Sequence, residues 1–261
     1  MDELEILVTN DDGIDSTGFH ALCDALSEVG NVTAVAPADD QSAVGRAISQ
    51  AVNVTEHERG FVLDGTPADC VIAGLSSLVP DADIVAAGCN RGANMGEAVL
   101  GRSGTVSAAV EAAFHGVPAV ATSLYIPPKQ FADSNTLPVA AFQDAVESTA
   151  YLVDNAFDAG IFEVADYLNI NAPVTEESTG EMVITRPSHV YPVTSERTGD
   201  SIELENPIWE MLAEGDIPDP EGTDRRAIVE KNVSVSPLTA PHTTERIESL
   251  EGLAGEFSAR N

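Results

Sequence analysis

Basic residues are scarce in this chain, and lysine is almost missing. Twelve lysines and arginines stand against 43 aspartates and glutamates, which gives a formal net charge of −31, and the two lysines are Lys129 and Lys231. Because no basic stripe can neutralise phosphates, we expect no duplex nucleic acid partner. The acids are dispersed over ordinary periodic segments, which argues against a disordered tail. Such a surface is typical of a protein that stays hydrated at high salt.

Long apolar runs and a secretory signal are also missing. The longest apolar runs are far too short to span a bilayer, and residues 1–3 form no basic start to a leader peptide. The three cysteines, Cys23, Cys70 and Cys89, have no metal-binding spacing and lie in apolar contexts. We therefore expect reduced core thiols in a cytoplasmic protein without a membrane partner.

The first two thirds of the chain alternate apolar runs with amphipathic segments. Strands are expected at residues 4–8, 31–36, 52–56, 61–63, 84–87, 117–123 and 167–171. Helices are expected directly after Ser16, at 69–78, at 103–115 and at 137–157. Such alternation favours parallel strands joined by crossover helices, and thus a Rossmann-like three-layer α/β fold with a mostly parallel sheet.

The character of the sequence changes after about residue 173. Short strands are expected at 182–185, 188–193 and 233–237, with a polar loop at 213–225 and a final amphipathic helix at 243–257. We therefore predict one domain with a core at 1–173 and a C-terminal extension of hairpins and a helix at 174–261. Exposed hairpins often serve subunit exchange.

The first predicted strand ends in two adjacent carboxylates, Asp11 and Asp12. Open α/β sheets bind their ligands at this end of their strands. Adjacent acids repel each other, and a hard divalent cation would offset that repulsion by accepting oxygen ligands. An Asx-turn that caps the following helix is the alternative interpretation.

Three more polar loops follow predicted strands or open a helix. They are residues 37–42, which include Ser42, residues 88–96, which include Asn90 and Asn94, and residues 101–105 before the helix at 103–115. The oxygen donors of Asp11, Asp12, Ser42 and Asn90 would suit Mg²⁺ or Mn²⁺. Ser103, Gly104 and Thr105 offer N–H groups and hydroxyls at a positive helix end, which favours a phosphate. Taken singly, each loop also reads as a glycine-rich turn or a helix cap.

Together these motifs resemble the SurE family, the stationary-phase survival proteins, which are metal-dependent 5′/3′-nucleotidases. The resemblance begins with the Asn-Asp-Asp-Gly turn at 10–13 and Ser42. It continues at 65–70 (Gly-Thr-Pro-Ala-Asp-Cys), 88–96 (Gly-x-Asn-x-Gly-x-Asn-x-Gly), 103–106 (Ser-Gly-Thr-Val), 222–224 (Gly-Thr-Asp) and 233–238 (Val-Ser-Val-Ser-Pro-Leu). With so little lysine, the chain is most similar to haloarchaeal members.

The resemblance implies a set of roles. The metal ligands would be Asp11, Asp12, Ser42 and Asn90, with the two aspartates also catalytic, and one Mn²⁺ or Mg²⁺ per subunit. The phosphate would be bound by Asn94, Ser103, Gly104 and Thr105. The family further implies hydrolysis of nucleoside 5′- or 3′-monophosphates, of short polyphosphate in some members, and homodimers or homotetramers built partly through the C-terminal extension.

Two positions depart from the family pattern. Arg102 stands where a tyrosine often precedes Ser-Gly-Thr-Val, and it either holds phosphate bidentately or is a surface residue. Asp39, Asp40 and Gln41 surround Ser42 where the family often has a basic residue and glycine, which makes the mouth of the site more acidic. Trp209 is expected to anchor the extension, with stacking on a base as the alternative.

Two other classes fit part of the pattern. A phospho-acceptor receiver domain also carries an acidic pair after its first strand, but it is normally about half this length and needs a suitably placed lysine. A non-catalytic nucleotide-binding protein would keep the site without turnover. Phosphate release from AMP with Mn²⁺ separates both classes from a phosphomonoesterase.

Overall fold

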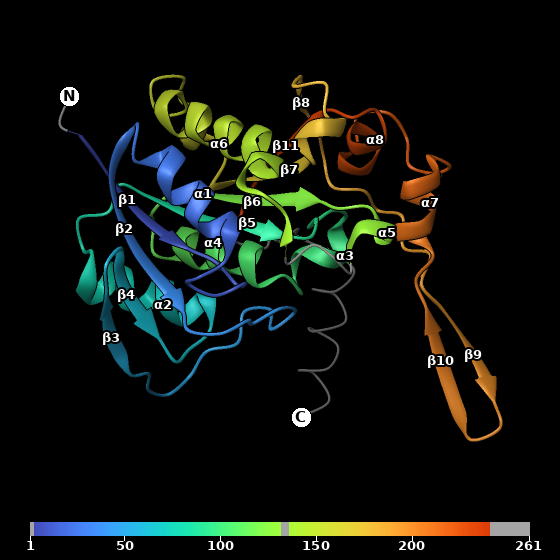
Figure 1. The fold of residues 1–261 in the computed structure, drawn as a ribbon, viewed down its shortest axis with the longest axis horizontal. Coiled ribbons are helices and arrows are strands. Elements are labelled where there is room, and N and C mark those ends of the chain that lie inside the picture. The colour runs from blue at the N-terminus through green and yellow to red at the C-terminus, as the bar shows by residue number, and fades with distance from the viewer. Residues whose placement is uncertain (1–2, 132–135, 241–261) are drawn as a thin grey trace, which may run out of the picture.

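The computed structural model describes residues 3–131 and 136–240, so the helix predicted at 243–257 lies outside the described residues. Its main feature is a nine-stranded sheet with the order β3-β4-β2-β1-β5-β6-β7-β11-β8 (Figure 1). The strands are β1 Leu4–Thr9, β2 Gly30–Pro37, β3 Val54–His57, β4 Gly60–Leu63, β5 Ile84–Arg91, β6 Ala119–Tyr125, β7 Tyr167–Pro173, β8 Met182–Ile184 and β11 Val233–Leu238.

The central strands of this sheet are parallel, as the alternation predicts. Strands β4, β2, β1, β5, β6 and β7 all run in one direction. Strand β3 pairs antiparallel with β4, and β11 pairs antiparallel with β7 and parallel with β8. The sheet is therefore mixed only at its two edges, and the carboxyl ends of the parallel strands share one side.

Helices cover both faces of the sheet (Figure 1). They are α1 Thr17–Leu26, α2 Pro67–Ala73, α3 Glu97–Leu100, α4 Gly104–Phe114, α5 Pro128–Phe131, α6 Gln143–Asn155, α7 Ile208–Glu214 and α8 Asp224–Val229. A π-helical turn, Gly74–Leu78, and 3₁₀ turns at Val139–Phe142, Ile161–Glu163 and Thr175–Glu177 complete the helical segments.

Two apolar cores lie on either side of the sheet, because side chains alternate along each strand. In β1, Ile6 and Val8 pack with α1 and α6, whereas Leu7 packs with α2 and α4 on the other face. Cys23, Cys70 and Cys89 are buried free thiols, as predicted. Among residues 3–131 and 136–240, no helix combines the length and the apolar character needed to cross a membrane.

The helix predicted at 137–157 is shorter and less regular than expected. Its first turn is the 3₁₀ segment Val139–Phe142, which follows Pro138, and the α-helix itself is α6. Strand β5, in turn, runs four residues beyond its predicted end, to Arg91. The extra residues pair with β6 after a register shift between Ala87 and Asn90, so a bulge carries the strand into the polar loop.

The prediction of a strand at 188–193 was wrong, because this stretch has no regular structure. Its backbone is bonded to side chains instead: the N–H of Ser188 donates to Asp224, and the carbonyl of Val190 accepts from Arg225. The polar loop predicted at 213–225 was also only partly right, since α7 ends and α8 begins within it.

A two-stranded hairpin projects from the body of the protein (Figure 1). Its strands, β9 Thr194–Thr198 and β10 Ser201–Glu205, are exposed along their whole length, and Ile202 and Leu204 are 62% and 77% exposed. A hairpin that buries none of its own apolar side chains is a candidate contact surface for another subunit.

Candidate active site

The predicted polar loops converge at the carboxyl ends of the parallel strands. They line a cavity of about 530 Å³ whose polar wall includes Asp11, Ser42, Asn90, Asn94 and Ser103. Other parts of the wall are Ala43, Arg91, Gly92, Ala93, Val99, Arg102, Tyr125, Ile126, Pro128, Phe131, Trp209 and Glu210. The lining of the cavity thus combines oxygen donors with apolar and aromatic side chains.

Asp11 lies at the polar side of the cavity and is only 3% exposed. Its two carboxylate oxygens accept bonds from the hydroxyl and the N–H of Thr105, at 2.6 and 3.1 Å. Burial is the main cause that raises the pKa of Asp11 to about 6; the charge of Asp12 also raises it, and the bonds from Thr105 oppose the rise. A buried carboxylate of this kind is stabilised by a cation beside it.

Asp12 lies against the other side of the same turn. One oxygen accepts the backbone N–H of Arg91 at 2.7 Å, and burial is the main cause that raises its pKa, opposed by that bond and by the Arg91 charge. Asp12 lines a neighbouring hollow together with Asp39 and Asp40 rather than the main cavity. Arg91 lines both spaces, so the two aspartates are presented to adjoining spaces.

Ser42 and Asn90 bring neutral oxygens to the main cavity. The N–H of Ser42 donates to the Asp40 carboxylate at 2.7 Å, which fixes the loop. The Ser42 hydroxyl takes no part in this bond. The side-chain amide of Asn90 donates to the carbonyl of Gly92, which leaves the amide oxygen as the remaining acceptor. Three of the four predicted metal ligands therefore line one cavity, and Asp12 adjoins it.

The amino end of α4 faces the same cavity. Ser103 is its N-cap: the hydroxyl accepts the N–H of Val106 at 3.1 Å, and the hydroxyl proton remains available to a ligand. The N–H of Gly104, at the first helical position, has no intrahelical acceptor. Thr105, which is predicted to bind the phosphate, directs its N–H and hydroxyl at Asp11 in this structure.

Gly104 is required by its closeness to Asp11. A Cβ atom added at this position would lie 2.8 Å from the Cβ and from one carboxylate oxygen of Asp11. Separations below about 3 Å between such atoms are not tolerated, so a side chain here displaces Asp11 or the start of α4. The glycine brings the helix end and the carboxylate into direct contact.

Asn94 is held by a buried amide network that the sequence analysis missed. Its backbone N–H donates to Asn171, its carbonyl accepts from Asn169 and Asn171, and its side-chain nitrogen donates to Ser123 at 2.9 Å. Asn169 and Asn171 stand two residues apart on strand β7, which is buried along its whole length. Polar residues at every second position of a buried strand were the available signal.

The C-terminal segment fixes the other end of the glycine-rich loop. The buried carboxylate of Asp224 accepts the N–H groups of Gly96, Ser188 and Arg225, at 2.7, 3.1 and 2.8 Å. Burial raises the pKa of Asp224 against the lowering effect of these bonds. The Gly-Thr-Asp motif at 222–224 therefore tethers the C-terminal segment to the loop that carries Asn90 and Asn94.

The sequence of the chain matches one family over most of its length. The sequence model described as Survival protein SurE matches residues 6–192. The chain belongs to the SurE family. A protein named 5′-nucleotidase SurE from Haloarcula marismortui is 61% identical over 260 residues, which cover 98% of this chain and 96% of that one. A protein of the same name from Pelobacter propionicus is 39% identical over 90% of this chain and 93% of its own.

The SurE fold is also found by structural comparison. The crystal structure of the SurE protein from Aquifex aeolicus matches with a TM-score of 0.73 and 28% sequence identity, covering 96% of this chain and 99% of that one. Several SurE proteins of high identity come from haloarchaea, which fits the net charge of −31 and a halophilic protein. SurE nucleotidases are generally metal-dependent.

Proposed function

We propose that this SurE protein is a metal-dependent 5′-nucleotidase that hydrolyses nucleoside 5′-monophosphates to nucleoside and inorganic phosphate. The observation that carries the proposal is the meeting of Asp11, Ser42 and Asn90 with the amino end of α4 at one cavity. The 5′-nucleotidase activity is taken from the names of its relatives, among them the SurE of Haloarcula marismortui, to which this chain is 61% identical.

The donor set fits one hard divalent ion, Mn²⁺ or Mg²⁺. Within residues 3–131 and 136–240, no cluster of three or more His, Cys, Asp or Glu side chains is suited to a metal. Asp11 and Asp12, which line adjoining hollows, would instead bind the ion together with the neutral oxygens of Ser42 and Asn90, and water would complete the shell. The raised pKa values of both aspartates support this, because a cation offsets the free-energy cost of two buried negative charges.

The remaining groups act on the phosphate and on the attacking water. The bound ion would supply Lewis-acid polarisation of the phosphoryl group. Ser103, Asn94 and the N–H of Gly104 would stabilise the equatorial oxygens, aided by the positive end of α4. Asp11 or Asp12 would orient the water and accept its proton during the in-line displacement.

The apolar and aromatic residues that line the cavity are suited to the nucleoside. They include Phe131 and Trp209, together with Tyr125 and Ile126. Aromatic faces stack on any base, which supports broad use of nucleotides rather than selection of one base. Trp209 also contacts the small apolar cluster around Ile208 and Leu212, so the anchoring role predicted for it is supported as well.

We also propose that the protein forms a homodimer or homotetramer in the cytoplasm. The exposed β9–β10 hairpin, with Ile202 and Leu204 on its surface, supports a subunit contact through the C-terminal extension at 174–261. The core at 1–173 would then carry most of the site. Sedimentation of the full chain in molar KCl tests the assembly.

The decisive experiment measures phosphate release and metal content on the same samples. EDTA-treated protein should hold no divalent ion and release no phosphate from 5′-AMP, and Mn²⁺ or Mg²⁺ should restore both. Adding 3′-AMP and tripolyphosphate to the screen tests the wider substrate range. Full activity after chelation would contradict the metal assignment, and stoichiometric nucleotide binding without turnover would point to a non-catalytic binding protein.

A further inference from the structure

Arg102 lies at the mouth of the cavity, directly before the N-cap of α4. Its side chain is exposed, and one guanidinium nitrogen donates to the hydroxyl of Tyr191 at 2.9 Å. The guanidinium carbon is 5.7 Å from the centre of the Tyr191 ring. The backbone is fixed on both sides, because Arg102 N–H donates to Val99 and its carbonyl accepts from Gly45.

The guanidinium of Arg102 has no ion-pair partner among the residues that the structure describes. Four other arginines have carboxylate partners: Arg46 with Glu111, Arg59 with Asp24, Arg91 with Asp40 and Arg225 with Asp219. Arg186, Arg197 and Arg226 donate to backbone carbonyls and do not line the cavity. In a chain with 43 acidic residues, a cation at a cavity mouth without such a partner remains open to an anion from solution.

Arg102 is also separated in depth from the floor of the site. Asp11, Asn94 and Ser103 are 3%, 6% and 5% exposed, so the reacting phosphate would lie deep in the cavity. Tyr191, which holds the guanidinium, is 50% exposed. The exposed guanidinium, bonded to this half-exposed tyrosine, is thus placed to meet a group nearer to solvent than the reacting phosphate.

We propose that Arg102, oriented by Tyr191, binds a second phosphate group of the substrate at the mouth of the cavity. The planar guanidinium makes paired bonds to two phosphate oxygens, and the tyrosine reduces the conformational freedom lost on binding. The second phosphate belongs either to a nucleotide that carries two phosphates or to an inorganic phosphate chain. The inference rests on the proposed function for the position of the reacting phosphate.

The test is competition against AMP hydrolysis, with free Mn²⁺ and KCl held constant. The competitors are inorganic phosphate, adenosine 3′,5′-bisphosphate and tripolyphosphate. In Arg102→Gln, the inhibition constant of adenosine 3′,5′-bisphosphate, of tripolyphosphate or of both, here called the two-phosphate ligands because each has at least two phosphate groups, should rise about tenfold through the loss of one bidentate contact. The KM for AMP and the inhibition constant of inorganic phosphate should change less than about twofold. The arm that responds identifies the source of the second phosphate.

Three further variants complete the test. Tyr191→Phe keeps the ring but loses the hydroxyl, and should give a smaller increase of about threefold. Arg102→Lys keeps the charge and should recover only part of the loss. Arg59→Gln removes the same charge at the opposite edge of the sheet, directly before β4, and should change none of these constants.

Either of two results would overturn the proposal. If Arg102→Gln weakens AMP and the two-phosphate ligands equally, Arg102 acts on the reacting phosphate or on the fold. If no constant changes, the mouth holds no second phosphate. Failure of the proposed function looks different, because the wild-type protein would then release no phosphate from AMP. Titration calorimetry with the same ligands would still compare wild type with Arg102→Gln.

Discussion

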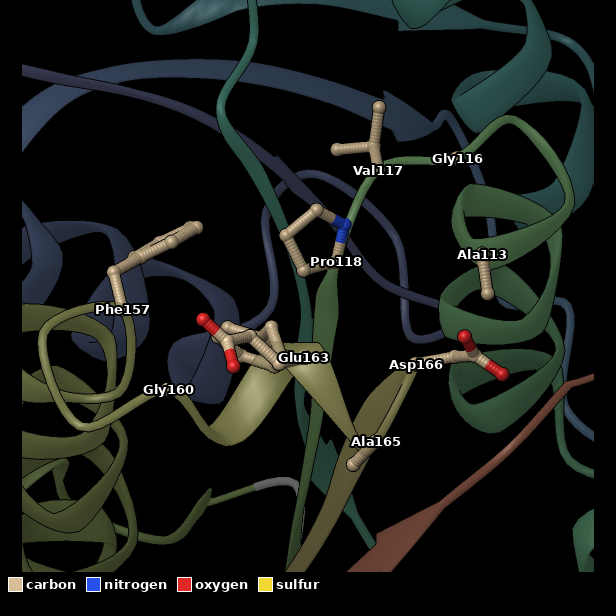
Figure 2. Close-up of a pocket in the computed structure, with 10 residues that line it drawn as sticks. Ala113, Gly116, Val117, Pro118, Phe157, Gly160, Glu163, Ala165 and Asp166 are labelled. Atoms are coloured by element: carbon tan, nitrogen blue, oxygen red, sulfur yellow. The ribbon is translucent and has the colours of Figure 1, made fainter.

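The two ends of the same parallel strands carry hollows of similar size and different chemistry. At the carboxyl ends lies the cavity of about 530 Å³ with its buried carboxylate, Asp11. At the amino ends lies a hollow of about 400 Å³, with Phe157, Pro118, Glu163 and Asp166 around it (Figure 2). Glu163 is exposed and Asp166 only partly buried, so water solvates their charges. Acidic side chains alone do not make a site, because burial and donors decide what they bind.

Helix α4 contributes opposite ends to the two hollows. Its amino end, at Ser103 and Gly104, faces the main cavity, and its carboxyl end leads through Gly116 to the other hollow. The helix dipole favours an anion at the first position and disfavours one at the second. A phosphate is therefore attracted to one end of the sheet, and the same helix repels it from the other.

The sharpest test of this difference replaces one acid at each end. Asp11→Asn and Asp12→Asn should each lower the turnover of AMP about 10³-fold, because metal ligation and proton acceptance are lost. Asp166→Asn should leave turnover unchanged, since the remaining oxygen still accepts the N–H of Ala240. Turnover is measured at saturating Mn²⁺, with circular dichroism as the control for folding. Near-normal turnover in either site variant would refute the assignment.

A glycine at each end should separate activity from stability. Gly104→Ala places a Cβ 2.8 Å from Asp11 and should lower kcat/KM up to about 100-fold through displacement of the carboxylate. Gly116→Ala meets nothing within 4 Å, but its φ of +76° is strained for alanine. That variant should lose about 1 kcal/mol of stability and keep its kcat/KM. Activity assays and thermal melts on both variants check that the first loses activity and the second loses stability.

The bond from Thr105 to Asp11 should appear in the pH dependence of activity. Burial raises the pKa of Asp11 to about 6, and the Thr105 hydroxyl holds it from rising further. Because a proton and a metal ion compete for this carboxylate, wild-type activity at a limiting Mn²⁺ concentration should fall as the pH drops below about 6. Thr105→Val removes the lowering bond, so the acidic limb of the profile should move to higher pH. An unchanged or lowered limb would show that Asp11 does not control it.

The sign of the stability effect is opposite to that of a salt-bridged acid. The folded-state pKa of Asp11 lies above the ordinary value of 3.8. Its contribution to the stability of the metal-free protein is therefore fully present below pH 3.8 and lost as the pH rises through about 6. Added Mn²⁺ should restore stability most strongly above pH 6, which thermal melts across pH will show.

The smallest expected effect concerns salt. Asp39 lies in the acidic loop beside the site, whereas Glu163 lies at the opposite edge. Asp39→Asn should lower the KM for AMP by about twofold in 0.1 M KCl, and the gain should vanish at 1 M, where the Debye length falls from about 10 to 3 Å. Glu163→Gln should match wild type at both concentrations. Equal effects of the two variants would make the repulsion a property of the whole surface.

Local patterns predicted the fold and the convergence of the polar loops. Alternating apolar runs fix parallel strands, and parallel strands bring the loops at Asp11, Ser42 and Asn90 to one edge. Contacts between distant parts of the chain were not predictable in this way. Tyr191 reaches Arg102 from a stretch that β propensity had marked as a strand, and Asn171 reaches Asn94 from β7. Only the folded chain decides which polar groups satisfy each other over such separations.

The strand order constrains how this protein is made on the ribosome. Strand β11 lies between β7 and β8, so β8 is synthesised before β11, the one strand it pairs with among residues 3–131 and 136–240. Residues 182–184 must wait, unpaired, until residues 233–238 emerge. The same delay applies to the anchor at Asp224, which holds Gly96 and Ser188. Such long-range pairing is slow to form, so the anchor of the glycine-rich loop cannot be complete until the last part of the described chain has been synthesised.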